Sequence, residues 1–195
     1  MSCTQRFSVA ACKKPPALVK PSLIADNGTP IMEARSAKRQ NDMDPKDCYN
    51  DLASHYHLLF ENWESSVARQ ASILGPILER QCGLPGETRI LDIACGIGTQ
   101  SLGLAKLGFR ITGCDISPAA VARARVEASQ RNLDIQFSVA DMLDLTGLEQ
   151  SNFDAVICMD NALPHLENAE QVIQAATQMR NKLRPKGLFM ASIRD

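Results

Sequence analysis

The stretch ILDIACGIGTQ, residues 90–100, decides the fold of this chain. Its apolar start predicts a buried strand, and Gly96 and Gly98 predict a tight turn from that strand into a helix. Such a turn is typical of nucleotide-binding α/β sheets, because glycines let a ligand approach the backbone closely. Asp92 places a carboxylate just before the turn. That carboxylate would repel an anionic ligand and attract a cationic one.

Strand and helix patterns alternate along the chain after two amphipathic helices, the second of which Gly75-Pro76 should kink or interrupt. Ser117 suits an N-cap and Pro118 the first turn of the helix that follows it. The expected strands cover 89–94, 109–114, 134–139, 153–159 and 187–193, and the expected helices cover 99–107, 118–131 and 167–183. This alternation predicts an α/β fold, a Rossmann-like open and mostly parallel sheet with helices on both faces. Ligands of such sheets bind beyond the carboxyl ends of the strands.

Composition limits the possible partners. The chain has 195 residues, 45% hydrophobic and 22% charged, with a net charge of -1. A net charge this close to zero does not favour binding to nucleic acid or to an acidic membrane. No apolar run approaches the ~20 residues of a membrane span. Seven cysteines without paired CxxC spacing favour reduced thiols in the cytoplasm, and argue against a metal site.

The first 47 residues differ from the rest. They hold eight Lys/Arg and five Asp/Glu and show no sustained periodicity, which predicts a disordered N-terminal segment over 1–47 before a domain over 48–195. The first 25 residues hold four bases and no acid, so import into an organelle is a weak alternative to a cytoplasmic location.

The glycine turn leaves two cofactor classes open. A dinucleotide prefers G-x-G-x-x-G, and Ser101 stands at the third glycine position of this chain. S-adenosylmethionine carries a sulfonium and an ammonium and no phosphate, so it suits Asp92 better. Asp92 would either contact the ammonium or hold the loop.

Later strand ends add polar residues to the same edge of the sheet. Asp115 ends the second strand, where a carboxylate can accept hydrogen bonds from both ribose hydroxyls. Asp141 and Met142 follow the third strand and would meet the adenine amino group and ring. Asp160, Asn161 and His165 follow the fourth strand.

Together these motifs resemble class I S-adenosylmethionine-dependent methyltransferases over about residues 49–195. The similar motifs are LDIACGIGTQ, GCDISP, VADML, FDAVICMDNALPHL and LRPKGLFMASIRD. Within that superfamily the chain is most similar to the glycine and sarcosine N-methyltransferase branch. The features of this finer resemblance are a helix with Tyr and Trp, Arg69, D-x-A-C-G, N-x-x-x-H and Arg194.

The resemblance implies roles for individual residues. Arg69 would pair with the cofactor carboxylate, while Asn161 and Arg194 would face the acceptor as catalytic residues. The implied cofactor-binding set is Tyr56, Trp63, Arg69, Asp92, Ala94, Cys95, Gly96, Gly98, Asp115, Ile116, Asp141, Met142, Met159 and His165. Cys95 of this set can also be interpreted as a small packing residue. Tyr49, outside this set, is interpreted as a core residue.

The predicted function is transfer of the methyl group of S-adenosylmethionine to a small-molecule amine of the glycine or sarcosine type, leaving S-adenosylhomocysteine. The transfer would be an in-line displacement that relies on positioning and needs no general base. Alternatives are another metabolite as acceptor, an NAD(P)-dependent oxidoreductase, or an inactive cofactor-binding module. The last arises because the sequence stops at Asp195, where the family's sheet continues with strands six and seven.

Overall fold

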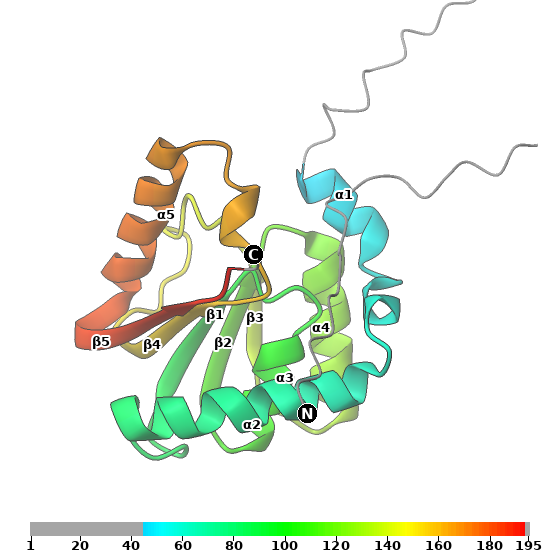
Figure 1. Cartoon of the computed structure of the whole chain (residues 1–195), viewed down its shortest axis with the longest axis horizontal. Coiled ribbons are helices and arrows are strands. Elements are labelled where there is room, and N and C mark those ends of the chain that lie inside the picture. Colours follow the sequence, from blue (N-terminus) through cyan, green and yellow to red (C-terminus); the bar gives the residue numbers. More distant parts are fainter. Residues whose placement is uncertain (1–44, 194–195) are drawn as a thin grey trace, which may run out of the picture. The chain divides into compact units, whose positions relative to one another are not determined.

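Five parallel strands form one open sheet in the order β3-β2-β1-β4-β5 (Figure 1). The computed structural model describes residues 45–193. The strands are β1 Arg89–Ile93, β2 Arg110–Asp115, β3 Gln136–Val139, β4 Phe153–Cys158 and β5 Leu183–Ala191. The helices are α1 Pro45–Leu52, η1 Tyr56–Leu59, α2 Trp63–Cys82, α3 Thr99–Lys106, α4 Pro118–Gln130, η2 Leu163–His165 and α5 Ala169–Lys182. The Rossmann-like open sheet expected from the sequence is confirmed.

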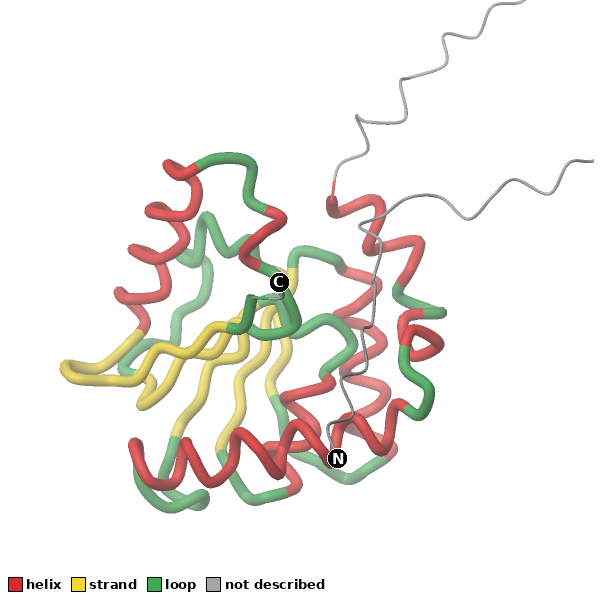
Figure 2. The backbone as a smooth tube through the Cα atoms, viewed as in Figure 1, coloured by secondary structure: helices red, strands yellow, loops and turns green. Residues whose placement is uncertain are grey.

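Helices cover both faces of the sheet, because neighbouring residues of each buried strand point to opposite sides. Ile90 packs with Leu74 and Leu78 of α2 on one face. Leu91 packs with Met179 of α5 on the other face. Figure 2 shows the corresponding arrangement, with the helices on either side of the strands. This two-sided burial leaves the carboxyl ends of the strands as the open edge.

Helix α2 corrects one expectation. Gly75-Pro76 was expected to kink or interrupt it, and the interruption does not occur, since one helix runs from Trp63 to Cys82 with Pro76 inside. Pro76 removes one backbone hydrogen bond, but buried side chains on both sides of it, including Val67 and Leu78, hold the helix against its neighbours. None of the helices in residues 45–193 is long and apolar enough to cross a membrane.

Some boundaries also differ from those expected, most clearly at helix α1 and strand β5. Helix α1 begins at Pro45 and so includes the last three residues of the segment expected to be disordered, and the rest of that segment lies outside the described residues. Strand β5 begins at Leu183, which pairs with Phe153, before an irregularity shifts the register. The sequence pattern placed this start four residues later because Pro185 and Lys186 interrupt the apolar run.

Candidate functional site

A cavity of about 310 Å³ opens at the carboxyl ends of the strands. Its wall comes from the loops that follow β1, β2, β3 and β4, with α1 and η1 contributing from the N-terminal side. Nine of the residues expected at a cofactor site line it: Tyr56, Ala94, Gly96, Asp115, Ile116, Asp141, Met142, Met159 and His165. The four strand ends therefore meet at one site, as their spacing predicted.

The turn after β1 exposes backbone to this cavity. Ala94, Gly96 and Gly98 have φ values of 56°, 55° and 93°, so the chain turns sharply through left-handed conformations. A Cβ added to Gly96 would meet nothing within 4 Å, whereas one added to Gly98 would lie 3.4 Å from Leu102 Cγ. Gly96 therefore leaves space on the cavity side, and Gly98 allows close packing behind the turn.

Asp115 ties the turn to the end of β2. Its Oδ2 accepts a hydrogen bond from the Gly96 N–H at 2.8 Å, and its Oδ1 accepts one from the Ser117 N–H at 2.9 Å. Burial raises the pKa of Asp115, while these two backbone donors oppose the rise. Each carboxylate oxygen has a further lone pair, so the group can still accept from two hydroxyls of a ligand.

Asp92 lies behind the turn and does not line the cavity. The Ser101 hydroxyl, in the first turn of α3, donates to Asp92 Oδ2 at 2.6 Å. Burial raises the pKa of Asp92 to about 7, and Asp160 and Asp115 add to the rise. The sequence left two roles open for Asp92, contact with the ammonium of the ligand or holding the loop. This geometry supports the second role.

The end of β4 carries an unusual backbone. Asp160 and Asn161 both have left-handed φ values, 52° and 69°. The Asp160 N–H donates to Ser192 Oγ at 2.8 Å, and Asp160 Oδ2 accepts from Gln100 Nε2 at 2.8 Å and from Gln70 Nε2 at 3.4 Å. Asp160 lines the cavity, while Asn161 is half-buried beside it and is not part of the wall. Non-glycine residues with such φ values are costly and concentrate at functional sites.

Tyr49 is a wall residue that the sequence interpretation placed in the core, and that interpretation is wrong. Its hydroxyl lies 2.9 Å from His165 Nε2, and the two rings meet edge to face at 5.6 Å. This contact joins α1 to η2 across the cavity. Helix α1 packs on α4 beside the open edge, and its one aromatic residue, Tyr49, faces the cavity. The sequence did hold a signal for this position, because the hydroxyl of a buried tyrosine usually forms a hydrogen bond and so favours a place beside polar groups.

Several expected site residues do not reach the wall. Trp63 is buried, with its Nε1 donating to Thr99 Oγ1 at 2.9 Å, so it belongs to the core and does not cover the cavity. Arg69 is exposed on α2 outside the wall. Cys95 is buried and its pKa is raised by that burial, as suits a packing residue. Gly98 lies behind the turn, and Arg194 lies outside the described residues.

The charged residues of the wall are all acidic. They are Asp115, Asp141, Asp160 and Glu167, and no Lys or Arg lines this cavity within residues 45–193. Burial, with a contribution from Asp115, raises the pKa of the Tyr49 hydroxyl, so Tyr49 adds no negative charge near neutral pH. No group of His, Cys, Asp and Glu in the described part of the chain has the arrangement of a metal site. A wall of this kind suits a ligand with positive charge.

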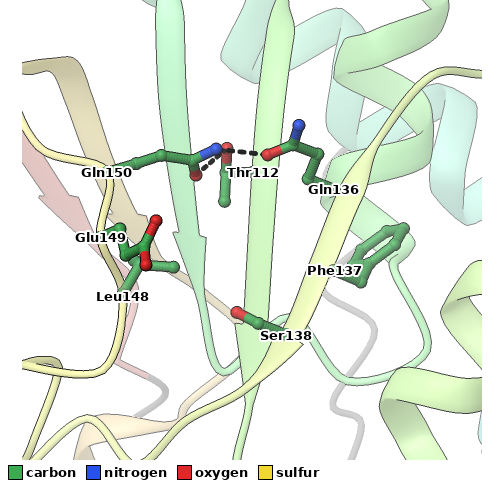
Figure 3. A pocket seen from close by; sticks show the side chains of 7 residues that line it. All are labelled: Thr112, Gln136, Phe137, Ser138, Leu148, Glu149 and Gln150. Atoms are coloured by element: carbon green, nitrogen blue, oxygen red, sulfur yellow. Dashed lines mark hydrogen bonds between the residues drawn. The ribbon is translucent and has the colours of Figure 1, made fainter.

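A second cavity, of about 240 Å³, lies beside strands β2 and β3 (Figure 3). Part of its polar lining is paired, since Thr112 Oγ1 donates to Gln150 Oε1 at 3.2 Å and Gln150 Nε2 donates to Gln136, whereas the buried Ser138 Oγ has no hydrogen-bond partner within residues 45–193. It contains none of the expected site residues. The cavity at the strand ends is therefore the candidate site.

Comparison with known proteins agrees with this placement. A family described as "Methyltransferase domain" matches residues 90–187, which span the glycine turn and the ends of β2, β3 and β4. YqeM of Bacillus subtilis (strain 168), a protein with a methyltransferase name, is 35% identical over 147 residues, 74% of this chain and 52% of that protein.

Two further similar proteins have names that point to different methyl acceptors. The ubiquinone biosynthesis O-methyltransferase of Xanthomonas axonopodis pv. citri (strain 306) is 32% identical over 110 residues, 56% of this chain and 44% of that protein. The magnesium protoporphyrin IX methyltransferase of Synechocystis PCC 6803, solved with bound S-adenosylhomocysteine, shares the fold at a TM-score of 0.57 and 23% identity, over 71% of this chain and 66% of that one. The chain spans about half the length of the curated relatives it matches.

Proposed function

Because the chain belongs to the methyltransferase-domain family, whose cofactor is S-adenosylmethionine, we propose that it transfers the methyl group of this cofactor to a small molecule. The observation that carries the proposal is the pairing of Gly96 with Asp115 at the open edge of the sheet. A glycine backbone and a carboxylate that could accept from ribose hydroxyls lie side by side there, and no basic side chain within residues 45–193 lines the cavity to bind a pyrophosphate.

The cofactor would lie along the ends of the strands. Asp115 would accept hydrogen bonds from the ribose hydroxyls, and Asp141 and Met142 would hold the adenine. The methionine half would then extend over the turn after β1 towards Met159 and Asp160 at the end of β4. Arg69 is not part of this arrangement, because it is exposed on α2 and does not line the wall.

The reaction needs little from the protein beyond placement. A lone pair of the acceptor forms a bond to the methyl carbon while the carbon–sulfur bond breaks, and the bonding electrons stay on sulfur as S-adenosylhomocysteine forms. An acceptor proton then leaves to solvent. Holding the acceptor atom ~3 Å from the methyl carbon, in line with sulfur, accounts for most of the acceleration.

For the acceptor, we propose an amino-acid amine of the glycine or sarcosine type, held by Asn161 and Arg194. Asn161 lies next to Asp160 at the end of β4, which supports a place near the methyl group. Arg194 can grip both oxygens of a carboxylate in one plane. A hydroxyl acceptor is the second candidate, favoured by the O-methyltransferase among the relatives and by His165 on the wall, whose ring nitrogen could take a hydroxyl proton.

Transfer of a labelled methyl group separates these candidates. The protein is incubated with methyl-labelled S-adenosylmethionine and matched acceptors: glycine, sarcosine, methylamine and a catechol. The amino-acid proposal expects transfer to glycine or sarcosine, with a Michaelis constant raised about tenfold by Arg194→Met. Transfer to methylamine as efficient as transfer to glycine or sarcosine contradicts the proposed binding of the acceptor carboxylate by Arg194. Transfer only to the catechol favours the hydroxyl acceptor. Cofactor binding without transfer to any of the four acceptors contradicts both proposed acceptors and leaves another metabolite or a binding module.

A further inference from the structure

The acidic wall bears directly on the difference between the cofactor and its product. S-adenosylmethionine and S-adenosylhomocysteine share the adenosine, the ammonium and the carboxylate, and differ by one methyl group and the positive charge on sulfur. Contacts to the shared parts affect both molecules alike. Since the charged side chains that line the wall within residues 45–193 are all carboxylates, the charge on sulfur is a feature that this part of the wall can distinguish.

Topology selects one carboxylate for this task. In the proposed arrangement, Asp115 and Asp141 at the ends of β2 and β3 hold the adenosine half. The sulfur then lies towards β1 and β4 on the other side, where Asp160 follows β4. Glu167 also lines the cavity, but it is exposed and solvent weakens its field. Asp160 is therefore the carboxylate best placed for a charge on sulfur.

Two amides fix the Asp160 side chain. Gln100 is buried and donates from Nε2 both to Asp160 Oδ2 at 2.8 Å and to Gln70 Oε1 at 2.5 Å. Gln70 Nε2 donates to the same carboxylate oxygen at 3.4 Å. The left-handed backbone of Asp160, at φ 52°, and its bond to Ser192 fix the residue further. A carboxylate held this way does not have to reorganise when a cation arrives.

We propose that Asp160, held by Gln70 and Gln100, makes the site bind S-adenosylmethionine in preference to S-adenosylhomocysteine and so limits inhibition by the product. The proposal rests on the proposed function. Methyl transfer removes the positive charge from sulfur, and the attraction to Asp160 disappears with it. The product then keeps only the contacts that it shares with the cofactor, including those of its ammonium, while the next cofactor molecule adds the attraction between its sulfonium and Asp160.

Calorimetric titration of the full chain tests this with three ligands: S-adenosylmethionine, S-adenosylhomocysteine and sinefungin, which carries an amine in place of the sulfonium. We expect both cations to bind at least about tenfold more tightly than S-adenosylhomocysteine, equivalent to ~1.4 kcal/mol. Asp160→Asn should reduce that preference at least about fivefold and change the affinity for the neutral product by less than about twofold. Asp134→Asn is the matched control, because Asp134 is an exposed carboxylate before β3, at the other end of the sheet.

Salt provides a measurement that needs no variant. Raising the ionic strength from about 0.05 M to 0.5 M should weaken binding of the two cations more than binding of the neutral product. Equal affinities for the three ligands in the wild-type protein overturn the proposal, as does an equal loss for all three in Asp160→Asn or an equal effect of Asp134→Asn. If no ligand binds the wild-type protein, the proposed function itself fails.

Discussion

At the scale of single residues, the site depends on a few short polar side chains whose positions the backbone fixes. Asp115 shows why such residues are predictable from sequence, since a carboxylate that ends the second strand of this fold has few other roles. Asp160 shows the opposite case. Its place on the wall follows from amide donors on α2 and α3, which lie 90 and 60 residues away along the chain, and no local pattern reveals them.

Replacing Asp115 tests the cofactor assignment. Asp115→Ala removes two acceptors for the ribose hydroxyls, so affinity for S-adenosylmethionine should fall by ~2 to 3 kcal/mol, as measured by calorimetry. The variant also frees the Gly96 N–H, so its fold is checked by circular dichroism. Asp134→Ala is the exposed control. Unchanged affinity in a folded Asp115→Ala protein means that the ribose lies elsewhere.

Asp92 should make stability depend on pH. Burial raises its pKa from 3.8 to about 7 in the folded protein. Between about pH 4 and pH 7 the folded state therefore binds this proton more tightly than the unfolded chain does. The contribution of Asp92 to the free energy of unfolding then falls as pH rises, by up to ~1.4 kcal/mol per pH unit, and levels off above about pH 7.

The variant Asp92→Asn isolates this effect, because an amide keeps an acceptor for the Ser101 hydroxyl but does not titrate. Urea unfolding at about pH 5 and about pH 8 should show a smaller loss of stability with rising pH in the variant than in the wild-type protein. The same loss in both proteins means that Asp92 titrates near its ordinary pKa.

At the scale of elements, packing between distant segments determines the features of the helices and strands that the sequence pattern did not predict. The apolar runs and the cap at Ser117 predicted the strands and helices of the sheet well, because their signals are local. The continuity of α2 through Pro76 and the early start of β5 depend on contacts with distant elements, so periodicity failed there. The prediction that Tyr49 lies in the core failed for the same reason, since helical periodicity does not distinguish a core position from a position on a cavity wall.

Gly103 is where α2 and α3 come closest. A Cβ added there would lie 2.7 Å from the Val67 carbonyl oxygen and 2.8 Å from Ala71 Cβ. Gly103→Ala should therefore push the helices apart and lower the free energy of unfolding by ~1 to 3 kcal/mol, despite the better helix propensity of alanine. Gly86→Ala is the control, because its Cβ would meet nothing within 4 Å. Equal stability of the two variants in urea unfolding means that the contact between α2 and α3 is looser.

At the scale of the whole molecule, helix α1 begins at Pro45, and the segment before it is expected to contribute nothing to the site. Deleting residues 1–40 should leave the melting midpoint and the affinity for S-adenosylmethionine nearly unchanged, because no core contact is lost. A fall of several degrees in a thermal melt, against the full chain at the same pH and salt, means that this segment packs on the domain.

The cavity at the strand ends is proposed to hold S-adenosylmethionine and not a dinucleotide. A thermal melt with S-adenosylmethionine, S-adenosylhomocysteine or NAD tests it most directly, since only a ligand of the folded state raises the midpoint. We expect a rise with both adenosyl ligands, smaller for S-adenosylhomocysteine and nearly abolished by Asp115→Ala, and no rise with NAD. A rise with NAD, or no rise with either adenosyl ligand, would contradict it.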